Sequence, residues 1–477
     1  MLFLVQTEIS IVTTSLVAIT HDLGGFETAS WIMSSYLLGY VGVVVIITKL
    51  SDIFGRKPAY MLSIFIFTVF SGGCAAAQTM PQLIIMRAFQ GVGGGGSYAL
   101  STVLIIEIVP PRKYGKLVAY TGIAIVLAMV LGPIIGGGIS SRTTWRWIFL
   151  FNVPVGAVGL ALAFIGIPDG FPNQNRPNSA GPSEKPFARL DLLGCVLLLL
   201  ATMSFTSAFQ EAGSRFSWDS AYVISLLVVS VVIWAALLTW ERATTLANKV
   251  REPVLPWRFL TSRAMVGILL EILLLGGPLT VTTLQLPQRF QLVNGLSSIK
   301  ASAILVPFGA AVPFGTIATA NLSKAKVPFL FIIVAGSLLQ VIGFALLGTL
   351  EASAHVPRGV YGYQVLAGLG CGLCFQAGFL AIPFTAEKRD QAVGLGTATQ
   401  SRAMGSAIMV AVTTSVFNGL SQASSLVAAG MTAEVEQLAR QILSRGYNRQ
   451  MYVLCACGAA QVPAAFLMWR KKQIKAM

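Results

Sequence analysis

The hydrophobic residues of this chain fall into long, nearly uninterrupted segments, and short polar stretches separate these segments. Each segment holds about twenty residues, the length of an α-helix that crosses the hydrocarbon core of a bilayer. The pattern therefore predicts an all-α polytopic membrane protein. We expect fourteen transmembrane helices, near residues 2–20, 31–49, 58–77, 81–106, 115–139, 146–168, 190–209, 220–240, 264–286, 300–320, 328–349, 360–384, 392–417 and 450–469.

Two polar segments divide the predicted helices into groups of six, two and six. The first segment is rich in Pro, Gly, Asn and Ser, which is typical of a flexible linker. We expect a third polar stretch, 418–449, to lie outside the membrane and to contain a short surface helix at 432–444. The predicted units are an N-terminal six-helix bundle (1–168), a cytoplasmic linker (169–189), two additional helices (190–240), a cytoplasmic loop (241–263), a C-terminal six-helix bundle (264–469) and a short basic tail (470–477).

The composition supports the membrane assignment. The chain has 477 residues, of which 55% are hydrophobic and only 11% charged, and its mean hydropathy is +0.75. A soluble protein carries about 25% charged residues, so a soluble globular protein, a disordered chain and a coiled coil are all excluded.

The basic residues predict the orientation of the chain. The net charge is +15, which in a soluble domain would suggest a nucleic-acid partner; here the stronger explanation is that Lys and Arg gather in cytoplasmic loops. Segments on the side of the 49–58 turn hold 22 basic residues, against 9 on the other side. We therefore expect this turn and both termini to face the cytoplasm, in a multi-pass protein of the cell membrane with no nucleic-acid partner.

Cysteine and histidine give no sign of a metal site. The six cysteines all lie in apolar segments, and the chain has only two histidines. Their spacing fits neither a zinc site nor a disulfide framework, and small buried hydrophobes explain the cysteines better. We expect no metal, no cofactor and no enzymatic activity.

Four ionisable residues fall inside predicted transmembrane helices: Glu8, Arg87, Glu271 and Arg402. A charge at the centre of a bilayer costs about 2.5–3.5 kcal/mol on insertion scales, so each one calls for an explanation. The functional explanation is a polar pathway for substrate or protons, in which Glu8 exchanges a proton and Arg87 stabilises its charged form or binds an anionic group. The alternative is an interfacial side chain or a structural ion pair.

Glycine clusters mark two of the predicted helices. One follows Arg87 and contains Gly91; the other contains Gly132, Pro133, Gly136 and Gly137. Glycine lets helices approach closely, and a proline loosens the backbone hydrogen bonds, so these segments are candidates for a hinge or sliding surface. Static close packing is the alternative.

A weak internal repeat relates the two six-helix groups. The spacing of Arg87, Gly91 and Gly93 recurs in Gln364, Gly368 and Gly370, in a helix with the same ordinal place. Repeated halves with a site between them at the midplane are typical of secondary transporters.

The turn at 49–58 is a candidate gate. Gly55 permits a tight turn, Pro58 suits the start of the next helix, Asp52 can face a helix N-terminus and Arg56 can pair with a carboxylate. Such contacts would hold one conformation. The alternative is a basic loop that only sets the topology.

These motifs resemble those of the major facilitator superfamily. The 49–58 turn resembles its loop 2–3 motif, Arg87 with Gln90 and Gly91 its helix 4 motif, and Gly132-Pro133 with Gly136-Gly137 its helix 5 antiporter motif. Glu8 stands where members often carry an Asp in helix 1. The 6 + 2 + 6 layout is similar to that of fourteen-spanner drug–proton antiporters, and segments 286–295 and 305–309 resemble fungal exporters of toxins or secondary metabolites.

The resemblance covers essentially the whole chain, with departures. Thr48, Val17 and Ala128 replace usual motif residues, and the second-half copy of the loop motif, near 321–328, is eroded; these changes bear on coupling more than on fold. The resemblance implies that Arg87 takes part in proton transfer or substrate binding. It also implies that Asp52 and Arg56 belong to the cytoplasmic gate.

The leading hypothesis is a secondary active transporter, a proton-coupled exporter of amphipathic small molecules such as a drug, toxin or secondary metabolite. The alternatives are a facilitator or importer of a small solute or metal chelate, and a membrane sensor that binds a ligand without moving it. We expect a monomer whose partners are the substrate, protons and the lipid bilayer. Proton coupling or substrate binding is assigned to Glu8, Arg87, Gln90, Glu271 and Arg402, and candidates for the cavity wall are Trp31, Tyr36, Gln285, Gln288, Gln364 and Gln376.

Overall fold

Helices make up almost all of the chain that the computed structural model describes. The described residues are 1–24, 30–108, 143–168, 171, 189–212, 216–247, 251–353, 355–418, 433–470 and 473–475, with scattered positions between 120 and 139. In the first half the helices are α1 (Leu2–Leu23), α2 (Ser30–Phe54), α3 (Arg56–Ala76), α4 (Met80–Ile108), α6 (Arg146–Leu150) and α7 (Asn152–Gly166). The predicted helix at 115–139 lies largely outside the described residues.

The rest of the chain continues the same pattern. An additional pair follows the first half, α9 (Leu192–Glu211) and α10 (Ala221–Ala247), and a short α11 (Trp257–Thr261) comes after it. The second half contains α12 (Arg263–Leu292), α13 (Ser298–Ile304), α14 (Val306–Lys324), α15 (Phe329–Leu347), α16 (Gly359–Thr385), η3 (Lys388–Asp390), α17 (Gln391–Asn418) and α19 (Ala433–Phe466).

Length and apolar composition confirm an all-α membrane protein. Within the described ranges, nine helical segments are long and apolar enough to cross a bilayer, among them Trp31–Phe54, Leu192–Glu211, Arg263–Leu292 and Gly359–Thr385. The total of fourteen stays a prediction.

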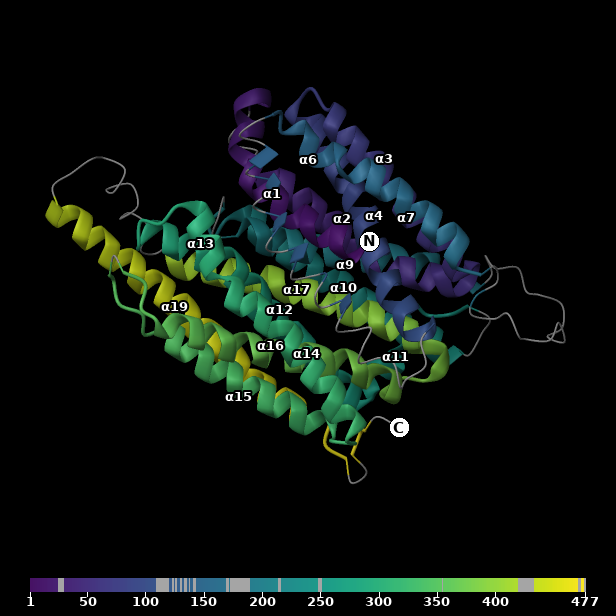
Figure 1. The fold of residues 1–477 in the computed structure, drawn as a ribbon. Coiled ribbons are helices and arrows are strands. Elements are labelled where there is room, and N and C mark those ends of the chain that lie inside the picture. The colour runs from purple at the N-terminus through teal and green to yellow at the C-terminus, as the bar shows by residue number, and fades with distance from the viewer. Residues whose placement is uncertain are drawn as a thin grey trace.

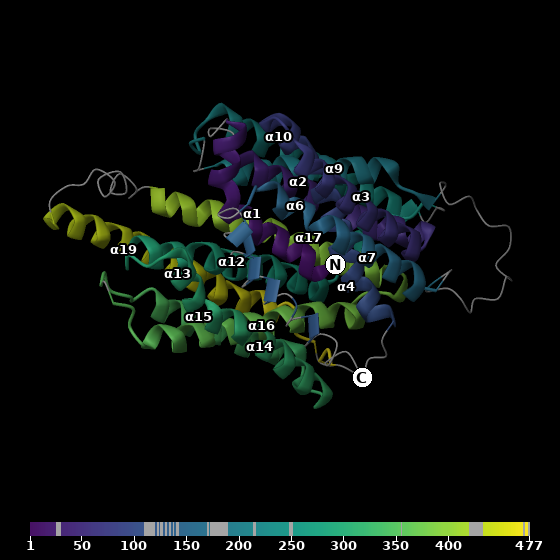
Figure 2. The ribbon, with the colours of Figure 1, turned by 45° about the horizontal axis from the view of Figure 1, so that its top comes forward.

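Two groups of helices face each other across α17. Figure 1 shows α1 to α7 on one side of the molecule and α12 to α16 with α19 on the other, and Figure 2 again places α17 between them. α17 packs mainly on α12 and also contacts α2 and α4. The seam between the halves therefore runs along α17, on the side facing α2 and α4.

The additional pair lies against this seam. α9 contacts both α2 and α17. A Cβ added to Gly42 of α2 would lie 2.8 Å from the Leu199 side chain of α9, and the Trp218 indole donates a 2.7 Å hydrogen bond to Ser415 on α17. The pair thus touches both halves.

Glycine makes the close packing of α2 on α4 possible. A Cβ at Gly91 would lie 2.9 Å from the carbonyl carbon of Tyr36 and nearer still to its oxygen, so no larger residue fits without separating the helices. Gly55, between α2 and α3, has a φ of 102°, a conformation that L side chains rarely adopt. The tight turn predicted at this glycine is confirmed.

Several helix boundaries differ from those predicted. The prediction of a separate surface helix at 432–444 was wrong, since α19 runs from Ala433 to Phe466 without a break. α12 continues to Leu292, six residues past its predicted end, and carries Arg289 into the protein instead of into a loop. A break at Leu305 divides the predicted 300–320 helix, because Pro307 lacks an N–H and fits only the first turn of α14.

Candidate functional site

An ion pair joins α1 to α4 inside the first half. Glu8 and Arg87 are each only 1% exposed, and Oε1 of Glu8 lies 2.6 Å from Nη1 of Arg87. The Arg87 Nε also donates a 3.1 Å hydrogen bond to the carbonyl oxygen of Ile32 on α2. Three helices therefore hold one arginine, and the sequence-predicted residues Glu8 and Arg87 meet.

Neutral polar side chains complete the surroundings of this pair. The amide of Asn152 on α7 donates to the second Glu8 oxygen, at 2.5 Å. Gln90 accepts from Arg87 at 2.8 Å and donates to Ser71 of α3 at 2.7 Å. Charge-assisted hydrogen bonds of this kind stabilise the ionised carboxylate. In its ionised form Glu8 therefore has a hydrogen-bond donor at each carboxylate oxygen.

Aromatic rings enclose the guanidinium of Arg87. Its central carbon lies 4.3 Å from the ring centroid of Tyr36 and 5.6 Å from that of Phe149. A cation over an aromatic face gains electrostatic stabilisation when water is excluded. Tyr36 is 1% exposed and its hydroxyl has no hydrogen-bond partner within the described structure.

Glu271 of α12 is a second buried carboxyl with a different environment. It is fully buried, and neither oxygen has a hydrogen-bond partner among the described residues. Its neighbours are Gly378 of α16 and Ile272: a Cβ at Gly378 would lie 2.6 Å from Oε2 of Glu271. Among the described residues no cation pairs with it, in contrast to Glu8.

Arg402 of α17 faces the first half across the seam. Its guanidinium carbon lies 5.8 Å from the ring centroid of Tyr98 on α4, and the ring of Tyr98 lies 6.1 Å from that of Tyr40 on α2. The residue is half-buried. Of the four ionisable residues predicted inside helices, Arg402 is thus the one that contacts the opposite half.

The predicted gate residues form a compact ion-pair cluster. Arg56 pairs with Asp52 one turn earlier and binds Glu107 of α4 through two hydrogen bonds of 2.9 and 2.8 Å. Its remaining nitrogen donates to Ser51 at 2.6 Å. These contacts join the α2–α3 turn to the end of α4. Arg56 was predicted to pair with a carboxylate, and it pairs with two, those of Asp52 and Glu107.

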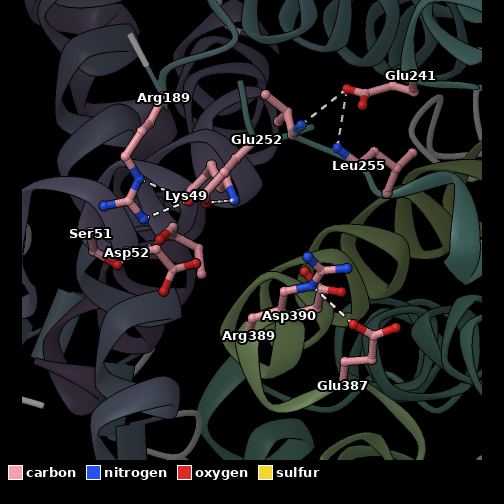
Figure 3. Close-up of polar contacts among 12 residues, drawn as sticks. Lys49, Ser51, Asp52, Arg189, Glu241, Glu252, Leu255, Glu387, Arg389 and Asp390 are labelled. Atoms are coloured by element: carbon pink, nitrogen blue, oxygen red, sulfur yellow. Dashed lines mark hydrogen bonds and ion pairs between the residues drawn. The ribbon is translucent and has the colours of Figure 1, made fainter. Parts of the chain in front are cut away.

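A second ion-pair network lies beside this cluster and involves the linker and the loop. Glu252 accepts from Lys49 of α2 at 2.6 Å and from Arg189 at 2.9 and 2.5 Å, and Figure 3 shows it between the two cations. Lys49 is 3% exposed. The backbone N–H of Glu252 also donates to the carbonyl of Arg189. The end of the linker and the start of the loop are thereby fixed to α2.

The same loop reaches the second half. We call residues 251–261 the connecting segment. Glu241 of α10 accepts hydrogen bonds from the backbone N–H groups of Val254 and Leu255, at 3.2 and 3.1 Å (Figure 3). Further along, Arg258 binds Asp390 of η3, with one bond of 2.8 Å. The connecting segment therefore joins α2 to the element that precedes α17.

We expect the substitution Glu252→Gln to destabilise the protein by about 1–3 kcal/mol at neutral pH, because Lys49 would keep its burial and lose its charged partner. Burial raises the pKa of Glu252, but hydrogen bonds and charges from Lys49 and Arg189 outweigh it and lower the pKa. The stabilisation that the Glu252 carboxylate provides should therefore be complete above its pKa in the unfolded chain, about 4.3. It should be lost as the pH falls through the lower pKa of Glu252 in the folded protein.

Thermal unfolding of both proteins in detergent across this pH range is the measurement. Glu387→Gln is the control: Glu387 is 57% exposed, and its partners are Arg389, 64% exposed, and Arg258 at 3.7 Å. Exposed pairs contribute about 1 kcal/mol or less. An equal effect of the two substitutions at every pH would contradict the prediction.

The remaining predicted site residues are scattered. Gln364, Gln376 and Gln285 are buried, at 0%, 3% and 7% exposure, and both polar atoms of Gln364 lack partners among the described residues. Trp31 is half-buried, and Gln288 is exposed on α12. Gly132 and Gly136 are buried, whereas Pro133 and Gly137 lie outside the described residues. The described part of the chain holds no cluster of three His, Cys, Asp or Glu side chains suited to a metal ion.

Sequence reasoning missed several partners. Asn152 is an ordinary polar residue near a predicted helix start, and nothing in its local pattern indicates a contact with Glu8. Glu252 lies in a loop whose charges suggested only topology. Arg289, assigned to a loop, is 1% exposed and donates to the carbonyls of Leu350 and Glu351; the apolar residues around it, such as Phe290, were the available signal.

Comparison with known proteins identifies relatives along the whole chain. The family model of the Major Facilitator Superfamily matches residues 1–213. The MFS-type transporter FPY5 of Fusarium mangiferae is 35% identical over 494 residues, covering 100% of this chain and 83% of the relative. The efflux pump dotC of Dothistroma septosporum is 31% identical, covering 90% of this chain and 73% of the relative.

A bacterial relative and a solved structure extend the comparison. Multidrug resistance protein 3 of Bacillus subtilis is 28% identical, with 77% of this chain and 68% of the relative covered. The proton:xylose symporter XylE shares the fold, with a TM-score of 0.60, 17% identity, and 100% and 95% of the two chains covered. FPY5 is named as a transporter, dotC as an efflux pump and XylE as a symporter. Taken with the helical fold and its apolar spans, they show that the chain is a multi-pass membrane transporter and belongs to the Major Facilitator Superfamily.

Proposed function

We propose that the protein is a proton-coupled exporter of amphipathic small molecules, with fourteen transmembrane helices and both termini in the cytoplasm of a cell whose surface membrane it spans. Relatives named as efflux pumps and as a multidrug resistance protein support the direction of transport. The observation that carries the proton coupling is the buried Glu8–Arg87 pair on α1 and α4.

The pair offers a simple coupling step. When Glu8 is ionised, it binds Arg87 and Asn152 and ties α1 to α4 and α7. A proton that reaches Glu8 removes its charge, weakens the contact with Arg87 and leaves the guanidinium to its other partners. The two protonation states therefore favour different packing of α1, which can be coupled to opening on opposite sides of the membrane.

The driving force is sufficient for export. Moving one elementary charge through 100 mV is worth about 2.3 kcal/mol, which corresponds to about a fifty-fold concentration ratio. Glu271 is a candidate for a further proton in the second half: because no described cation pairs with it, its buried carboxyl suits the neutral acid.

Transport in reconstituted vesicles tests the proposal. We expect wild-type protein to accumulate an amphipathic dye, fluorescein or rhodamine 123, against its gradient when protons are supplied from the opposite side, and to stop when an ionophore collapses the pH gradient. Glu8→Gln should abolish this proton-driven accumulation when transport is expressed per amount of protein in the membrane. Accumulation that survives the ionophore would contradict proton coupling, and net flux only down the dye gradient would favour the facilitator.

A further inference from the structure

Arg402 is fixed to the second half and exposes its charge toward the first. It is the twelfth of the 28 residues of α17, so it lies near the middle of the helix. Close contacts hold this part of α17 on α12: a Cβ at Gly276 would lie 2.7 Å from the backbone nitrogen of Ser406, and a Cβ at Gly405 would lie 2.7 Å from the carbonyl carbon of Leu273. The guanidinium nevertheless lies over the ring of Tyr98 on α4, and the ring of Tyr40 on α2 is next to that of Tyr98.

The charge of Arg402 has no carboxylate to balance it within the described structure. No Asp or Glu oxygen lies within 4.0 Å of it, and its buried Nε atom has no hydrogen-bond partner there. Arg87, by comparison, is neutralised by Glu8, and Arg258 by Asp390. Arg402 is also half-buried, whereas Arg87 is 1% exposed. A cation near the middle of a transmembrane helix, partly accessible and unneutralised, is suited to bind an anion.

Three buried aromatic rings lie in a row beside this cation. The rings of Tyr36 and Tyr40 lie 6.4 Å apart between centroids, and those of Tyr40 and Tyr98 lie 6.1 Å apart. Ala403 and Met404 of α17 pack against the hydrophobic cluster to which these tyrosines belong. A planar guanidinium binds a carboxylate through two parallel hydrogen bonds, and aromatic rings stack on other rings. The seam thus combines the two contacts that an aromatic carboxylate makes.

We propose that Arg402, with Tyr40 and Tyr98, binds the carboxylate of an aromatic, negatively charged substrate at the seam between the halves. The proposal rests on the proposed transport function and names its substrate class. Such a ligand would contact α17 on one side and α2 and α4 on the other, so its binding would depend on the relative position of the two halves. Export of a monoanion in exchange for one proton would move two charges in the same electrical sense.

Dye binding to the purified full-length protein tests the assignment without requiring transport. Fluorescein and rhodamine 123 share a xanthene ring system, but the first is an anion with a free carboxylate and the second a cation with an esterified one. We expect fluorescein to bind the wild type at least tenfold more tightly, as measured by fluorescence anisotropy. Benzoate should displace it and benzamide should not.

Variants at Arg402 sharpen the test. Arg402→Gln should weaken fluorescein binding by about tenfold to a hundredfold without weakening rhodamine 123 binding, because the lost cation attracts only the anionic dye, and Arg402→Lys should give an intermediate loss. Arg358→Gln is the control, because Arg358 is exposed at the start of α16. Equal binding of the two dyes, or equal displacement by benzoate and benzamide, would overturn the proposal even if Arg402→Gln failed to fold. Fluorescein binding without proton-dependent transport would refute the coupling and keep the anion site.

Discussion

The substitution Arg87→Ala should destabilise the protein by about 3–5 kcal/mol, because it leaves the Glu8 carboxylate buried without its cation. The loss should appear as a large drop in the thermal unfolding temperature in detergent and in the amount of protein in the membrane. Asn152 would still donate one hydrogen bond to Glu8, so the effect comes from the missing charge. An unfolding temperature equal to that of the wild type would contradict this view of the pair.

A double variant separates stability from transport. Glu8→Gln with Arg87→Gln removes both charges and leaves two neutral polar side chains, so most of the lost stability should return. Dye export should remain absent, since the group that exchanges the proton is gone. Restored export in the double variant would show that the pair is only a structural contact.

The substitution Gly91→Ala should have an effect of comparable size for a steric reason. The added methyl group would meet the backbone of Tyr36, which cannot move aside as a side chain end can. Overpacking typically costs about 1–3 kcal/mol, and here α2 and α4 would also have to separate. We expect the free energy of unfolding to fall by more than about 2 kcal/mol, measured by thermal unfolding in detergent. The contact of Arg87 with Ile32 on α2 should be disturbed as well.

Gly362→Ala provides the control within a helix. Nothing lies within 4 Å of a Cβ added at Gly362 of α16, so alanine there should be neutral or stabilise by up to about 1 kcal/mol through its better helix propensity. If both substitutions had the same effect, close approach of α2 and α4 would not be what the glycine at 91 provides.

The apolar segments carried most of the information about the fold. Nine of the helices they predict are long and apolar enough to span a bilayer in the described chain, and Gly55 has the conformation that its turn requires. Helix ends were harder, because a helix that continues past the membrane loses the apolar signal without losing its hydrogen bonds. This explains why α19 begins at Ala433, well before the predicted start at 450, and why Arg289 was assigned to a loop.

The candidate site could be found in part. Charges inside apolar segments indicated Glu8 and Arg87, since such residues are rare where water is absent. Their direct contact, the role of Asn152 and the carbonyl of Ile32 depend on how four helices pack, and no local pattern encodes that. Glu8 pairs with a cation and Glu271 has none among the described residues. This difference was also invisible in the sequence, because both are single acidic residues in apolar helices.

The position of α9 has a consequence for how substrates enter. This helix covers the line where α2 meets α17, and its Leu199 and Met203 side chains pack on Gly42 of α2. A compound dissolved in the bilayer could not diffuse sideways through that line to reach Arg402. A lateral portal for lipid-dissolved compounds would have to lie on the far side of the molecule. The additional helix pair would thus close one of the two lateral routes between the halves and leave the other.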